Sequence, residues 1–463
     1  MSEMESPVNI FEETTDHMPK MDIRSWLIGR PLATADAPHQ TIGKLIGLAV
    51  FSSDAMSSVA YGPQELMMIL AVTGLANLHL AIPIVIALIV LLTILVFSYE
   101  QTIHAYPGGG GAYIVARDNL GELPAQTAGA ALLTDYILTV AVSISSGVAQ
   151  LVSAFPILYP YRVWISVAMI LFIMLINLRG VKESGITFAI PTYFFLLMMF
   201  LTVIIGLVQL LSGNLSAVAN PPAFELTVLQ PLSVFLILRA FANGTTSLTG
   251  VEAISNGITA FKEPRSSNAG KTLIWMAGIM AVLLLGITVL SVKINAVPAE
   301  SETVVSQLFR TIYNGRGVLY MLSISATTVI LIMAANTAFA DFPRLGALHA
   351  GDGFLPRQMT FRGSRLVYSS GIISLAAFSS ILVIGFSASV TKLLPLYAIG
   401  VFLSFTLSQT GMARRWWKSG HLKPDEEIVE PGSVVRFDKG WIFKMVVNSI
   451  GAVSTFIVMI IFA

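Results

Sequence analysis

The sequence contains no cysteine and very little charge. Only 11% of its 463 residues are charged, against about 25% in a typical soluble domain. Without cysteine the chain cannot form disulfides, thiolate metal sites or iron–sulfur clusters. Its six histidines lack metal-ligand spacing, and it has no Lys/Arg-rich run of the kind that binds nucleic acid. We therefore expect no enzyme, no cofactor and no nucleic-acid partner.

Long apolar runs are abundant instead, since 55% of the residues are hydrophobic. A run of about 18 residues or more can cross a bilayer as a helix. Such runs predict an all-α, polytopic protein that spans a lipid bilayer. The eleven predicted helices cover about 43–73, 79–103, 125–155, 161–178, 185–212, 230–258, 272–293, 317–340, 367–387, 392–412 and 440–462.

The first 42 residues and the basic residues predict the orientation. The N-terminal segment begins with an acidic stretch and has no apolar core, so it predicts a flexible cytosolic tail, not a cleaved signal. With this tail inside, most of the 27 Lys and Arg residues fall on the cytosolic side, as the positive-inside rule requires. We expect a multi-pass protein of the plasma membrane with a cytosolic N-terminus.

Two of the predicted helices are interrupted by small polar residues, SSDAMSS at 52–58 and ANGTTSLTG at 242–250. Matching interruptions of this kind point to a transporter binding site near the bilayer midplane. Small polar residues also allow close helix packing, but packing does not require the carboxylate of Asp54, which we expect to lie in unwound backbone at the first interruption. The spacing predicts five-helix repeats at 43–212 and 230–412, joined by an extracellular loop at 213–229. A cytosolic loop at 413–439 and the eleventh helix at 440–463 follow.

Three of these helices place carboxylates and hydroxyls on shared faces. The sets are Asp54 with Tyr61, Asp135 with Thr139 and Ser143, and Glu252 with Thr249. Carboxylate and hydroxyl oxygens are hard ligands for a cation. At ~4 Å and an effective dielectric constant near 20, Asp54 would repel a substrate carboxylate by about 4 kcal/mol. The pattern therefore favours a cation as the substrate.

Glu252 is the residue expected to couple transport to protons. It follows the second interruption and enters the cytosolic half of its helix. Crowded carboxylates in a medium of low dielectric constant do not all ionise together, so one of them can exchange a proton.

Four long segments resemble the amino acid–polyamine–organocation superfamily, and within it the KUP-family potassium–proton symporters of the KimA type. They read SSDAMSSVAYG, AYPGGGGAYIVARDNLG, LLTDYILTVAVSISSG and FANGTTSLTGVEAISNGITAFKEPRSSNAGKTL. The resemblance runs from about 43 to 462. It implies a 5+5 inverted-repeat fold with broken first and sixth helices, which imports potassium by alternating access.

The resemblance also implies roles for individual residues. Potassium would be held at the matching positions Asp54, Tyr61, Asp135, Thr139 and Thr249, and Glu252 would take part in proton coupling. Tyr136 and Ser143 adjoin the matching segment, and Tyr397 falls where the family has a contributing tyrosine. Potassium and protons are thus the expected transported species.

Two further expectations stay open at this point. KimA-type members carry a twelfth helix and a cytosolic C-terminal domain that binds a cyclic dinucleotide and joins two protomers. This sequence ends at Ala463, so a homodimer and nucleotide regulation are left open. An amino acid or polyamine permease on the same fold is the alternative function, while a channel is disfavoured because no TVGYG-type filter is present.

Overall fold

The computed structural model describes residues 42–109, 111–179, 185–223, 229–363 and 367–462. Except for Ile42, the predicted cytosolic tail lies outside the described residues. The main elements are α2 (Lys44–Phe51), α3 (Ser53–Ser57), α4 (Gly62–Ala71), α5 (Ala81–Ala105), α6 (Gly111–Leu120), α7 (Glu122–Ala154), α8 (Arg162–Leu178), α9 (Gly185–Leu211), α10 (Val234–Thr245), α11 (Ala253–Asn256), α12 (Arg265–Lys293), α13 (Val304–Ile312), α14 (Val318–Gly351), α15 (Ser369–Gly385), α16 (Val390–Gly420), β1 (Glu427–Glu430), β2 (Ser433–Arg436) and α17 (Trp441–Phe462). Short 3₁₀ turns include η2 (Ser58–Ala60), η5 (Thr246–Leu248) and η6 (Ile258–Ala260).

The helices account for the predicted membrane spans. Within the described residues, nine helical segments are long and apolar enough to cross a membrane, and the bent unit of α2 with Ser53–Ala71 is a tenth. The apolar helix α15 has 17 residues and is about 26 Å long at 1.5 Å per residue. Each of the eleven predicted spans coincides with one of these units, which confirms a polytopic all-α protein.

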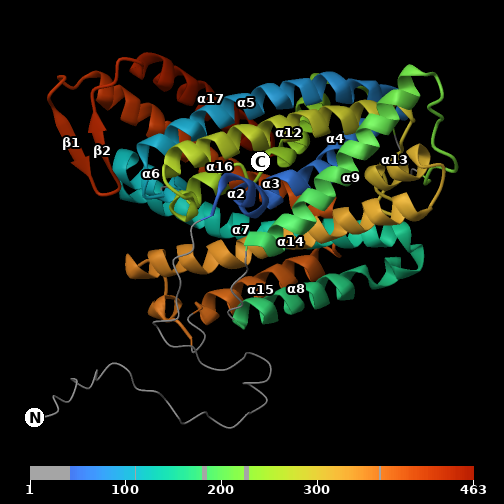
Figure 1. Cartoon of the computed structure of the whole chain (residues 1–463), viewed down its shortest axis with the longest axis horizontal. Coiled ribbons are helices and arrows are strands. Elements are labelled where there is room, and N and C mark those ends of the chain that lie inside the picture. Colours follow the sequence, from blue (N-terminus) through green and yellow to red (C-terminus); the bar gives the residue numbers. More distant parts are fainter. Residues whose placement is uncertain (1–41, 110, 180–184, 224–228, 364–366, 463) are drawn as a thin grey trace, which may run out of the picture.

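The long helices lie side by side, and α7 is at their centre (Figure 1). In its most apolar stretch α7 is 83% buried, against 22% for α8 and for α17. Helices α14 and α16 both pack on α7. The β1–β2 hairpin and α6 lie at one end of the bundle, here called the hairpin end, and α13 lies at the other (Figure 1).

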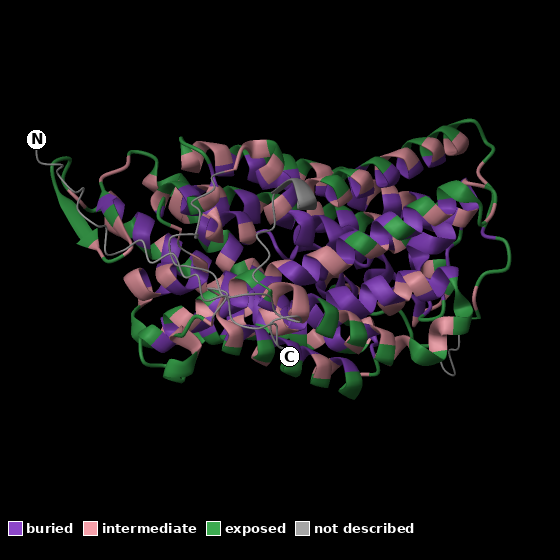
Figure 2. Cartoon of the chain, turned by 60° about the horizontal axis from the view of Figure 1, so that its bottom comes forward, coloured by how far each residue is buried: buried purple, intermediate pink, exposed green. Residues whose placement is uncertain are grey.

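The outer surface of the bundle is apolar. Figure 2 shows the buried residues in the interior and the exposed ones around it. Large hydrophobic side chains point outward along single helices, for example Ile86, Val90 and Phe97 on α5, each at least half exposed. Apolar surface on this scale requires a lipid environment.

The first interruption is sharper than the sequence predicted. The chain bends by 59° between α2 and the following helical segment, and the bend is at Ser52, which belongs to neither helix. Ser53–Ser57 form the short helix α3. Asp54 therefore lies in the first turn of a helix, and the expectation that it sits in unwound backbone is wrong.

The second interruption lies further along the chain than predicted. Helix α10 continues through Thr245, and η5 carries the helical path to Leu248. The backbone becomes extended at Thr249, and Gly250 has a φ of +81°. The helix resumes only at Ala253. The true break is thus the four residues 249–252.

The hairpin is held to the bundle by a buried ion pair. The ammonium of Lys418 lies 2.7 Å from the carboxylate of Glu430, and the guanidinium of Arg415 lies 3.7 Å from it. Only 8% of the Glu430 side chain is exposed. Arg415 also donates to the carbonyl oxygen of Val434 at 2.8 Å. These contacts fix both strands against α16.

We predict that Glu430→Gln loosens the hairpin, because it leaves the buried Arg415 and the partly buried Lys418 without their counter-charge. The loss should be about 2 kcal/mol of local stability. Trypsin should then cleave faster at the exposed Lys439, directly after the hairpin, measured as the rate at which intact chain disappears. Glu427→Gln is the matched control, since Glu427 pairs with Arg436 at the surface; equal cleavage rates in both variants would contradict the prediction.

Candidate functional site

The two helix breaks pack directly against each other at the centre of the bundle. The hydroxyl of Ser58 donates to the carbonyl oxygen of Ser247 at 2.7 Å. A Cβ atom on Gly250 would lie 2.8 Å from both the Asp54 Oδ2 atom and the Ala55 nitrogen. Only glycine allows this close approach, and it also tolerates the positive φ. The break at 249–252 therefore packs closely against the carboxylate of Asp54.

A small cavity opens where the breaks meet α7 and α14. About 10 Å³ is open to the centre of a water-sized sphere, which is room for about one water molecule or one ion. No Lys, Arg or His is among its lining residues, although four of them are acidic. The cavity is lined by Asp54, Asp135, Tyr136, Thr139, Gly250, Glu252, Ala253, Asn256, Thr337 and Asp341.

Two of the carboxylates each have a buried oxygen that accepts no hydrogen bond from the described residues. The Oδ1 atom of Asp135 and the Oε2 atom of Glu252 are buried, and in the described part of the chain neither has a partner. Asp135, Glu252 and Asp54 are close enough to repel one another electrostatically. A buried carboxylate without a partner costs several kcal/mol, so the site favours a guest that brings positive charge.

Three of the expected ligands adjoin the cavity without lining it. The Thr139 hydroxyl donates to the hydroxyl of Tyr397 at 3.3 Å. Tyr61 lies within hydrogen-bonding reach of Thr249 and within electrostatic range of Asp54. Both tyrosines are buried. The structure therefore brings Tyr61, Thr249 and Tyr397 to the rim of the acidic cavity.

The two remaining sequence candidates, Tyr136 and Ser143, lie at different distances along α7 from the cavity. Tyr136 lines the cavity, and its hydroxyl accepts a hydrogen bond from the Asn256 amide at 3.5 Å. Ser143 is buried in α7, one turn beyond Thr139, but it is not among the cavity-lining residues. Eight of the nine sequence candidates therefore gather around one point, and Ser143 lies further along α7.

Asp341, Thr337 and Asn256 line the cavity and escaped the sequence reasoning. The predicted span ended at residue 340, whereas α14 runs to Gly351. Thr337 and Asp341 are four residues apart on one helical face, the spacing that singled out Asp135 and Thr139. The same four-residue spacing, searched for beyond the predicted end of the span, would have found Thr337 and Asp341.

The acids surround the cavity without forming a compact metal centre. Among the described residues, no group of three or more Asp, Glu, His or Cys side chains is placed to hold a metal ion. Divalent metals require such convergent ligands.

The bundle of apolar helices around a break-lined polar cavity is typical of secondary transporters. The chain belongs to the amino acid permease family, whose sequence pattern matches residues 41–463. The predicted superfamily is thereby confirmed.

The chain is also similar in sequence to two curated transport proteins. The chain is 45% identical to the potassium transporter KimA of Bacillus subtilis over 437 residues, which are 94% of this chain and 69% of that protein. This confirms the resemblance to the KimA type. It is also 28% identical over 194 residues to cationic amino acid transporter 6, chloroplastic, of Arabidopsis thaliana, covering 39% of this chain and 31% of that protein.

We predict that Gly250→Ala destabilises the site, because the new Cβ would collide with Asp54 and would adopt an unfavourable φ. The penalty should be about 1–3 kcal/mol, measured as a lower midpoint of thermal unfolding in detergent. Gly278→Ala on α12 is the control, since its Cβ would have no neighbour within 4 Å. Unfolding midpoints that are lowered equally would refute the proposed close fit.

Proposed function

We propose that this protein is a secondary active transporter that imports potassium, coupled to protons, by alternating access. The observation that carries the proposal is the central cavity, which is lined by four acids and has room for one small guest. The 45% identical relative is named a potassium transporter. The family match supports a transporter that uses broken helices.

The size of the cavity favours an ion over the alternative substrates. An amino acid or a polyamine needs far more than the room of one water molecule, and an amino acid also brings a carboxylate that Asp54 would repel. The partial similarity to a cationic amino acid transporter covers less than half of this chain. A potassium ion needs only oxygen atoms around one point.

The roles of the residues follow from their positions. Asp54 and Asp135 supply the negative charge that replaces part of the ion's hydration. The oxygens of Thr139, Tyr61 and Thr249 lie next to them and complete the oxygen shell, and Tyr136 and Tyr397 belong to the wall of the same site. Glu252 lines the same cavity, has one oxygen without a hydrogen-bond partner among the described residues, and exchanges the coupled proton.

The same proposal assigns the architecture and its orientation. The two five-helix halves, 43–212 and 230–412, each begin with one of the broken helices that meet at the site. The hairpin end is cytosolic, because most of the basic residues lie on that side of the chain's spans. The plasma membrane is the proposed location.

We predict that the purified protein takes up potassium into proteoliposomes and that an inward proton gradient accelerates uptake. Asp54→Asn should reduce uptake at least about tenfold, since a lost charge–ion contact costs about 1.5–3 kcal/mol. Glu100→Gln is the control, because Glu100 lies at the surface beside His104. Potassium-independent uptake of amino acids instead would overturn the assignment.

We predict that Glu252→Gln separates potassium movement from the proton gradient. The amide cannot exchange a proton, so the remaining uptake should be the same with and without the gradient. The measurement is the ratio of initial rates under the two conditions. If the variant keeps the ratio of the unmodified protein, Glu252 is not the coupling group.

A further inference from the structure

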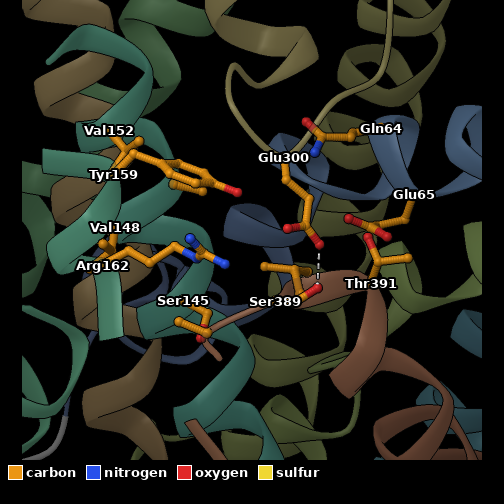
Figure 3. A pocket seen from close by; sticks show the side chains of 13 residues that line it. Gln64, Glu65, Ser145, Val148, Val152, Tyr159, Arg162, Glu300, Ser389 and Thr391 are labelled. Carbon is orange, nitrogen blue, oxygen red and sulfur yellow. Dashed lines mark hydrogen bonds between the residues drawn. The ribbon is translucent and has the colours of Figure 1, made fainter. Parts of the chain in front are cut away.

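A second polar cavity lies toward the α13 end of the bundle. It has room for about two water molecules, with about 30 Å³ open to the centre of a water-sized sphere. Its walls come from α4, α7, the start of α8, the segment before α13 and the start of α16. Figure 3 shows the polar lining residues, among them Glu65, Glu300, Arg162, Ser389 and Thr391.

Glu65 is the most informative residue of this outer cavity. Only 1% of it is exposed, and its Oε2 atom is buried without a hydrogen-bond partner among the described residues. Its carboxylate lies beside the Thr391 hydroxyl and within electrostatic range of Glu300. Two acids that repel each other across a small cavity are stabilised when a cation enters between them.

The two other charged residues of this cavity, Glu300 and Arg162, each have polar contacts of their own. Glu300 is exposed and accepts a hydrogen bond from the Ser389 hydroxyl at 2.5 Å. Arg162 is on the opposite wall (Figure 3), where it donates to the carbonyl oxygen of Ser387 at 3.1 Å and lies over the ring of Tyr159 at 4.2 Å. The lining thus carries two negative charges and one positive charge.

The outer cavity is in line with the central one. Helix α7 lines both, through Asp135 and Thr139 below and through Ser145 and Val148 above. From Thr139 to Ser145 is about 9 Å at 1.5 Å per residue. Tyr61, at the rim of the central cavity, is within electrostatic range of both Asp54 and Glu65. A cation that leaves the outer cavity inward therefore meets the rim of the central site.

We propose that Glu65 and Glu300 form a separate site for a monovalent cation, which collects the ion before it reaches Asp54. This rests on the proposed function, since it takes the α13 end as the extracellular entrance. The acids of this site lower the concentration of ion needed for transport. Glu65, Glu300, Ser389 and Thr391 supply its oxygen ligands.

The absence of cysteine makes a direct test of this site simple. A single Val390→Cys substitution places a thiol in the lining of the outer cavity, and a positively charged thiol reagent reports its access. Rubidium at ten times its dissociation constant should slow modification about tenfold by mass action. The protection should persist in an added Asp54→Asn variant and disappear with added Glu65→Gln or Glu300→Gln.

Uptake of radioactive rubidium gives the functional counterpart. Glu65→Gln and Glu300→Gln should each raise the KM about 3- to 10-fold with kcat unchanged, because local enrichment of the ion is lost. Glu263→Gln is the control, since Glu263 is exposed beside Arg265 at the hairpin end. Arg162→Gln should lower the KM, because it removes the one positive charge of the lining.

The outcomes separate this proposal from the proposed function. If rubidium gives no protection, if Glu65→Gln leaves protection intact, or if Asp54→Asn abolishes it, the outer site is refuted while potassium uptake by the unmodified protein still stands. If the unmodified protein fails to transport potassium but keeps Glu65-dependent protection, the transport function is wrong and the cation site is supported.

Discussion

The structure depends on one electrostatic constraint, which is the burial of Asp54, Asp135 and Glu252 around a cavity whose lining carries no basic side chain. Each ionised carboxylate in such surroundings costs several kcal/mol. The protein can lower that cost only with a proton or with a mobile cation. Because the proton and the cation would bind to the same few oxygens, binding of one changes the stabilisation that the other provides, and the proposed coupling of potassium to protons rests on this.

The backbone around the acids is shaped by hydroxyl groups. Thr245, Thr246 and Ser247 each donate to the carbonyl oxygen three residues earlier, at 2.5–2.6 Å. Ser57 and Ser58 do the same in the first interrupted helix. These bonds satisfy carbonyl groups and tighten the turns into 3₁₀ geometry. They also explain why polar stretches that predict unwound backbone remain helical until the bend at Ser52 and the extended residue Thr249.

The sequence therefore predicted the architecture better than the geometry of its breaks. Apolar runs locate helices because lipid leaves the chain few alternatives. Hydroxyl-rich stretches are ambiguous, since the same side chains support a tight turn or replace a missing backbone hydrogen bond. The meeting of Asp54 with Asp135 and Glu252 could be inferred from charge and spacing. The contribution of Asp341 was missed because the predicted span ended one residue before it, while the helix and its face continued.

The two acidic cavities along α7 give the path of the ion a physical direction. The outer pair includes an exposed carboxylate, Glu300, and shares its cavity with Arg162, so the proposed outer site would hold a cation weakly and release it easily. The central acids are buried and have no basic neighbour in the cavity lining, so they gain more from the same charge. In the proposed function a cation would therefore move from weaker to stronger stabilisation, and the proton that Glu252 exchanges would set how much negative charge surrounds it.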